Sequence, residues 1–133
     1  MKPVVLLTSG TRGDLLPYLA LAEGLRRAGR PLRVVAPLEF KELVEERGLP
    51  FAPLDGNPSE LMTRGGGQSA LTYDGSWLRS LQATRRYLQA ARPLYQRMLS
   101  SAVGACQGAA ALVIGLPSTW GSHIAEAMGI PCI

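Results

Sequence analysis

Short apolar runs alternate along this chain with stretches in which apolar residues recur every three to four positions. The short runs predict β-strands at residues 4–8, 32–36, 51–54, 109–115 and 130–133. The periodic stretches predict helices at residues 15–28, 76–103 and 120–128, with a second helix opened by Pro37 and ended by Gly48. Pro93 lies inside the longest helical stretch and predicts a kink or a split there.

The β-α-β-α-β alternation predicts an α/β fold with a doubly wound parallel sheet and right-handed crossovers. We expect three layers, α/β/α, with strand order 3-2-1-4-5. After the third strand we expect a short helical turn at residues 59–62. Residues 64–69 have no ordering pattern and predict a loop, with a mobile lid over an acceptor as the alternative.

The segment from residue 4 to residue 17 is organised as strand, glycine-bearing turn and helix start. Gly10 and Gly13 predict a tight turn that approaches a ligand closely, and Asp14 can cap the helix with Pro17 in its first turn. The N–H groups of such a helix start attract anions. The segment is neither the dinucleotide fingerprint nor a P-loop. A purely structural turn remains the alternative to a ligand site.

Composition narrows the class of protein. The chain has 133 residues, of which 47% are hydrophobic, so we expect one folded domain with a real core. No apolar run is long enough to span a bilayer, and no signal-peptide pattern is present. Cys106, Cys132 and the single histidine, His123, offer no metal-ligand spacing. We therefore expect no metal site, free thiols and a cytoplasmic location.

Charge is unevenly distributed along the chain. The formal net charge is +4, and residues 75–125 contain no acidic side chain. The arginines of that span are Arg79, Arg85, Arg86, Arg92 and Arg97. They predict either a solvated helix face or a face for an anionic lipid surface, which would make the protein peripheral to a membrane. Nucleic acid is not expected, because no binding motif or interleaved stacking aromatics accompany the arginines.

Three segments carry a resemblance to a known family. They are Gly10-Thr11-Arg12-Gly13-Asp14 followed by residues 17–22, then residues 53–58, then residues 123–131. Together they resemble the N-terminal half of the GT-B glycosyltransferases, in the family 28-like branch of sterol glucosyltransferases and antibiotic glycosyltransferases. The first segment is fairly specific, and the resemblance covers nearly the whole chain.

The resemblance implies a Rossmann-like acceptor domain at residues 1–133 that ends within its fifth strand, with the donor domain absent. It implies transfer of a sugar, with inversion and usually without a metal, from a nucleotide sugar to a hydroxyl of a lipid, sterol or natural product. No cofactor is expected beyond that co-substrate. Asp14 is the candidate base. Gly10, Thr11, Arg12 and Gly13 are the candidate substrate-binding residues.

His123 is assigned a structural or packing role, because it lies within a later helix. Without a donor domain, we expect this chain alone to be inactive. Two alternatives remain. The chain could be a non-catalytic acceptor-binding or membrane-binding subunit of a split glycosyltransferase, or an unrelated α/β binding module.

Overall fold

The computed structural model describes residues 1–58, 60–61 and 75–133. The loop expected at residues 64–69, with its lid alternative, lies outside these residues. So do the first and last residues of the helical turn expected at 59–62.

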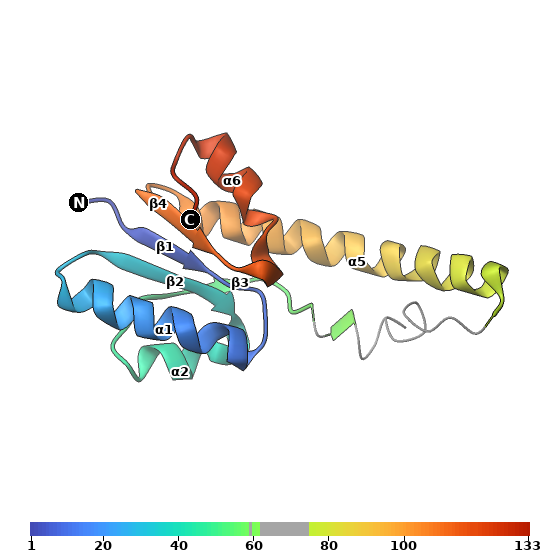
Figure 1. Cartoon of the computed structure of the whole chain (residues 1–133), viewed down its shortest axis with the longest axis horizontal. Helices are drawn as coiled ribbons and strands as arrows, with labels where there is room; N and C mark the ends of the chain where they lie inside the picture. Colours follow the sequence, from blue (N-terminus) through green and yellow to red (C-terminus); the bar gives the residue numbers. More distant parts are fainter. Residues whose placement is uncertain (59, 62–74) are drawn as a thin grey trace.

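The sheet has four parallel strands: β1 (Val4–Leu7), β2 (Leu32–Pro37), β3 (Phe51–Leu54) and β4 (Ala111–Ile114). Their order is β3-β2-β1-β4, as predicted, and β1 lies between β2 and β4 (Figure 1). The predicted fifth strand is reduced to one parallel bridge, between Leu112 and Cys132. That bridge lies beside β4, where the predicted order puts the fifth strand.

Helices cover both faces of the sheet. The α-helices are α1 (Arg12–Arg27), α2 (Lys41–Glu45), α5 (Trp77–Cys106) and α6 (Gly121–Met128), and the short 3₁₀ helices are η1 (Leu38–Phe40) and η2 (Leu116–Ser118). Leu6 of β1 packs into a cluster with α1 and α2, whereas Val5 and Leu7 pack into a second cluster with α5 and α6. Alternate side chains of one strand thus enter two cores, which confirms the three-layer prediction.

Helix α1 begins three residues earlier than the sequence predicted. Thr11, rather than Asp14, is its N-cap residue, so Asp14 lies within the first turn. Pro17 therefore falls in the second turn, and its predicted first-turn placement was wrong. Pro17 and Gly13 are both exposed, so water can reach the Gly13 carbonyl that the missing Pro17 N–H leaves free.

Two other helix predictions need correction. The stretch between Pro37 and Gly48 divides into η1 and α2 and does not form one helix. Helix α5 continues through Pro93 without a split. Pro93 is exposed, while Ala91, Leu94 and Met98 on either side of it remain buried. Packing on the sheet therefore outweighs the loss of one intrahelical hydrogen bond.

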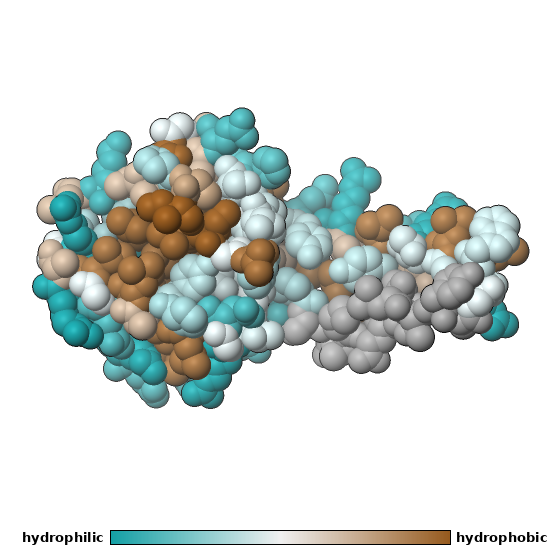
Figure 2. Space-filling model, in the orientation of Figure 1, coloured by the Kyte–Doolittle hydropathy of each residue, from teal (hydrophilic) through white to brown (hydrophobic). Residues whose placement is uncertain are grey.

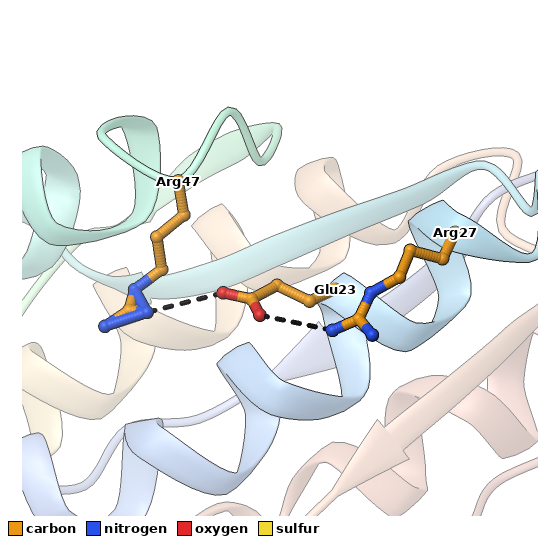
Figure 3. A network of polar contacts seen from close by, with 3 residues as sticks. All are labelled: Glu23, Arg27 and Arg47. Atoms are coloured by element: carbon orange, nitrogen blue, oxygen red, sulfur yellow. Dashed lines mark hydrogen bonds and ion pairs between the residues drawn. The ribbon is translucent and has the colours of Figure 1, made fainter.

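A small ion-pair network joins α1 to the turn after α2. Glu23 lies 3.4 Å from Arg47 and 3.7 Å from Arg27 (Figure 3). These side chains are at least partly exposed, so we expect the network to contribute no more than about 1 kcal/mol. It lies on the α1–α2 layer, away from the carboxyl ends of the strands.

The N-terminal part of α5 projects beyond the sheet, while its C-terminal part packs against it (Figure 1). In the part of the chain that the structure describes, no helix combines the length and the apolarity needed to cross a bilayer.

Gly56 marks the point where the chain after β3 packs closely on α5. Its φ is +122°, and a Cβ there would lie 2.6 Å from Leu94 Cδ1 and 3.0 Å from Met98 Cγ. Gly24, inside α1, is the opposite case, because a Cβ there would meet nothing within 4 Å. The two glycines therefore provide a matched pair for testing the packing.

We predict that Gly56→Ala lowers the free energy of unfolding by about 1–3 kcal/mol, since it adds backbone strain and overpacks the core. Gly24→Ala should raise it by about 0.5–1 kcal/mol, since alanine favours the helix. Urea denaturation of the two variants measures both changes. A stabilised Gly56→Ala protein would contradict the close packing of this loop on α5.

Candidate functional site

The loops after β1 and β4 lie side by side at the carboxyl edge of the sheet. The chain leaves β1 into α1 on one face of the sheet, whereas it leaves β4 into α6 on the opposite face. The two loops therefore diverge at the point where the winding of the sheet reverses. In open α/β sheets, ligands bind in the crevice at such a point.

Asp14 folds back onto the start of its own helix. Its Oδ2 accepts a hydrogen bond from the Thr11 backbone N–H at 2.7 Å and another from the Thr11 hydroxyl at 2.9 Å. The carboxyl group also lies against the Gly10 backbone, where a Cβ would come within 2.3 Å of Oδ2 and 2.8 Å of the Asp14 Cβ. Gly10 thus permits a close approach, but the group that approaches is the Asp14 side chain, and the approach of a ligand stays a prediction.

Gly13 has a different position. It lies in the first turn of α1, exposed to solvent, and a Cβ there would have Thr11 Oγ1 as its nearest contact, at 3.7 Å. Neither Gly10 nor Gly13 has a positive φ. The backbone therefore does not need glycine at position 13, and the surface above it is open.

The hydrogen bonds at the turn stabilise the charged form of Asp14. The Thr11 backbone N–H, followed by the Thr11 hydroxyl, lowers the pKa of the Asp14 carboxyl below its ordinary value. Asp14 is therefore ionised at neutral pH. Burial, and then the nearby Asp14 charge, raises the pKa of Tyr18 on the next turn of α1.

The turn opens into a cleft of about 620 Å³, a volume typical of sites for small molecules. The residues that line the cleft are Ser9, Gly10, Thr11, Arg12, Asp14, Glu39, Phe40, Asn57, Pro58, Tyr95 and Pro117. Four of the five predicted site residues therefore lie together in its wall, while Gly13 does not line it. Aromatic and proline rings supply an apolar part, and Asp14, Glu39 and Arg12 supply charge.

Sequence reasoning missed the part of the wall that follows β2 and β3. Asn57 Nδ2 donates a hydrogen bond to Glu39 Oε1 at 2.6 Å. Both residues also line a neighbouring hollow of about 580 Å³ that contains Asp55 and Arg97. A signal was present in the sequence, because these residues directly follow two predicted parallel strands whose ends must meet at the same edge.

Tyr95 of α5 also lines the cleft. It lies three residues before Met98, about one turn of the helix away, but Met98 is fully buried whereas Tyr95 is 40% exposed. Burial, and then Tyr87, raises the pKa of its hydroxyl.

The remaining candidate residues lie away from the cleft. The His123 side chain is 81% exposed on α6, with Nδ1 4.0 Å from a Glu126 carboxyl oxygen, so of the predicted structural or packing role the packing part was wrong. Cys106 is buried and Cys132 is exposed, and neither is in a disulfide. Among the described residues, no three His, Cys, Asp or Glu side chains gather as a metal ion would require.

Relatives of this chain are glycosyltransferases. It is 38% identical over 128 residues to the sterol 3-beta-glucosyltransferases of Neurospora crassa and Sclerotinia sclerotiorum. Those alignments cover 96% of this chain and 8% of each relative. The chain thus spans less than a tenth of the length of the curated relatives it matches.

Solved structures show the same fold. The Streptomyces sp. SF2575 glycosyltransferase SsfS6 matches with a TM-score of 0.70 and 21% identity, over 99% of this chain and 38% of that protein. MurG of Acinetobacter baumannii matches with a TM-score of 0.57 and 21% identity, over 99% of this chain and 34% of that protein.

Residues 4–133 match the family model of the glycosyltransferase family 28 N-terminal domain. Because this match covers the strands, the turn and the cleft described above, the chain belongs to the glycosyltransferase family 28 N-terminal domain family.

Proposed function

We propose that this chain is the acceptor-binding half of an inverting glycosyltransferase. The enzyme would transfer a sugar from a nucleotide-sugar donor to a hydroxyl of a lipid, sterol or natural product. The observation that supports this most directly is Asp14, an ionised carboxylate in a cleft that also has aromatic and proline walls. Such a cleft suits an acceptor with an apolar body and one reacting hydroxyl.

In this proposal Asp14 acts as the general base. The acceptor oxygen forms a bond to the anomeric carbon while the bond from that carbon to the diphosphate breaks, and Asp14 takes the hydroxyl proton. Both hydrogen bonds from Thr11 end on Oδ2, so we assign the proton to Oδ1. A bound apolar acceptor would exclude water from the carboxylate and raise its basicity, opposing the effect of Thr11.

The start of α1 has a second role in the proposal. The Thr11 N–H is already bonded to Asp14, so the Arg12 side chain and the backbone N–H groups of Arg12 and Gly13 would stabilise the negative charge that develops on the leaving diphosphate. The donor itself would be held mainly by a second domain, since the chain spans only a small part of its relatives. We therefore expect the 133 residues alone to bind a nucleotide sugar weakly and to show no transfer.

The alternative, an acceptor-binding or membrane-binding subunit without its own catalysis, has one observation in its favour. Leu81 and Leu88 of α5 are large apolar side chains that remain exposed, and their spacing of seven residues, about two helical turns, places them on one face. Leu81 is 60% exposed and Leu88 is 59% exposed, and with Thr84, Arg85, Gln89 and Arg92 they line a shallow hollow. Figure 2 shows hydrophobic residues among hydrophilic ones along this projecting part.

We propose that this face of α5 rests on an anionic lipid surface, on the cytoplasmic side of a membrane. The leucines would enter the interface, and Arg85 and Arg92, one helical turn from Leu81 and Leu88, would contact anionic headgroups. Peripheral membrane contact is compatible with either function, because a lipid or sterol acceptor resides in a membrane.

Asp14→Asn tests the proposed base. Asparagine can still accept hydrogen bonds from Thr11, so the stability should change little. In a two-domain enzyme that carries this chain, turnover should fall by about 10²–10⁴-fold, because asparagine cannot take the proton. For the unchanged enzyme, kcat/KM for the acceptor should stay level through neutral pH and fall as the pH drops toward the lowered pKa of the free Asp14 carboxyl.

Steady-state kinetics gives the turnover, and urea denaturation of the same variant gives the stability. Near-normal turnover of Asp14→Asn would mean that Asp14 only organises the helix start, and that another group acts as the base.

Vesicle sedimentation tests the membrane face with two neighbouring arginines. Arg85 lines the hollow together with the exposed leucines, whereas Arg86, about 100° further around the helix, does not line it. Arg85→Gln should weaken binding to phosphatidylglycerol-containing vesicles by roughly fivefold, since one headgroup contact is worth about 1 kcal/mol. Arg86→Gln, with the same change in net charge, should have a smaller effect.

Binding should also weaken as salt is added, because the contact is electrostatic. Equal recovery of the unchanged chain with neutral and anionic vesicles at low salt would rule out the proposed surface.

A further inference from the structure

Two buried serines join the loop after β1 to the loop after β4. Ser9 is 3% exposed and Ser118 is fully buried, although they lie 109 residues apart in the sequence. The Ser9 backbone N–H donates to Ser118 Oγ at 2.8 Å, and the Ser9 hydroxyl donates to the Pro117 carbonyl at 2.6 Å. The two hydroxyl oxygens lie 3.0 Å apart.

These distances assign the hydroxyl protons. The single proton of the Ser9 hydroxyl is directed to the Pro117 carbonyl, so the Ser118 hydroxyl must be the donor in the contact between the two serines. Ser118 thus accepts from the Ser9 backbone and donates to the Ser9 side chain. Each hydroxyl proton has an acceptor, and each serine fixes the orientation of the other.

The serine pair lies at the start of the segment that leads from β1 to Asp14. The Thr8 N–H, which donates to the Val35 carbonyl at 2.9 Å, continues the hydrogen-bond ladder between β1 and β2. Ser9 is the next residue, and it is held instead by Ser118 and Pro117. Gly10 follows, with the Asp14 carboxyl group against its backbone, and Thr11 then supplies both donors to Asp14 Oδ2.

A further contact links α1 to the loop after β4. The Tyr18 hydroxyl lies so close to Gly115 that a Cβ on Gly115 would be 2.4 Å from its oxygen. Gly115 in turn accepts a hydrogen bond from the Ser118 N–H at 2.8 Å. The loop after β4 therefore contacts the chain on both sides of Asp14, at Ser9 before it and at Tyr18 after it.

We propose that Ser9 and Ser118 are positioning residues that hold the Asp14 carboxylate in the cleft. They do not touch the reacting atoms and act through the backbone of Gly10 and Thr11. The catalytic meaning of this inference rests on the proposed role of Asp14 as a base, but its structural effect can be measured without turnover.

The test is Ser118→Ala in the 133-residue chain, with the pKa of Asp14 measured from its ¹³C carboxyl shift. The substitution leaves the Ser9 N–H without its acceptor and should allow the turn to relax. The bonds from Thr11 to Oδ2 should then weaken, so the pKa of Asp14 should rise toward its ordinary value. Among the described residues, Arg12, Glu39 and Tyr95 are the other charged or titratable groups that line the cleft, and Tyr18 interacts with Asp14 along α1. The variant changes none of them.

Ser101→Ala is the matched control. The Ser101 hydroxyl on α5 accepts a hydrogen bond from the backbone N–H of Asp55, just after β3, at 2.9 Å. Its removal therefore breaks the same kind of bond, between a serine hydroxyl and a backbone N–H far away in the sequence. It should leave the pKa of Asp14 unchanged. If Ser118→Ala does not fold, Ser9→Ala takes its place, since it keeps the backbone bond to Ser118 and removes the Ser9 hydroxyl. An unchanged pKa of Asp14 in the folded variant would overturn the inference.

Kinetics in the two-domain enzyme separates this inference from the proposed function. Ser118→Ala should lower kcat by about ten- to a hundredfold and change the KM for the acceptor little. In an Asp14→Asn background it should lower kcat no further. If Ser118→Ala raises the pKa of Asp14 but Asp14→Asn retains turnover, the positioning effect stands and the assignment of the base fails.

Discussion

The burial of β1 between two helical layers is the constraint on which the rest of this structure depends. Val5, Leu6 and Leu7 are all fully buried, and their side chains alternate between the two cores. A strand paired on both edges and covered on both faces has no freedom to slide, because a shift by one residue would exchange its two faces. The register of β1 in the sheet is therefore fixed, and so is the position of the turn that follows its carboxyl end.

The same hydrogen bonds that organise this turn oppose the chemistry proposed for it. Two bonds from Thr11 stabilise the charged form of Asp14, and a group stabilised as an anion is a weaker base. The conflict is resolved if the free carboxylate is held in position at little basicity and gains basicity when an apolar acceptor displaces water. Phe40, Pro58 and Tyr95 in the cleft wall provide the surface against which such an acceptor could pack.

Local patterns in the sequence were enough to predict the order of the strands, the layers and one wall of the cleft. Alternation gave the strand order and the three layers, and the turn motif placed Gly10, Thr11, Arg12 and Asp14 in one wall of the cleft. The split predicted at Pro93 does not occur, because a local rule gives the cost of proline without the packing that offsets it. Pro17 was misplaced for another reason, since the start of α1 was predicted three residues too late. Ser9 and Ser118 gave no signal, since a contact between residues 109 apart is visible only once the sheet has assembled.

Helix α5 joins the two proposed surfaces, and its geometry decides how they can work together. Leu81, Leu88 and Tyr95 are spaced by seven residues, so they lie along one face, and Tyr95 lines the cleft. At a rise of 1.5 Å per residue, Leu81 lies about 21 Å from Tyr95 along the axis. Contact through the tip of the helix alone would leave the cleft that far from the lipid. Contact along the whole face would bring Tyr95 to the interface, and in the proposed function this orientation would let a lipid-embedded hydroxyl reach Asp14 without leaving the membrane entirely.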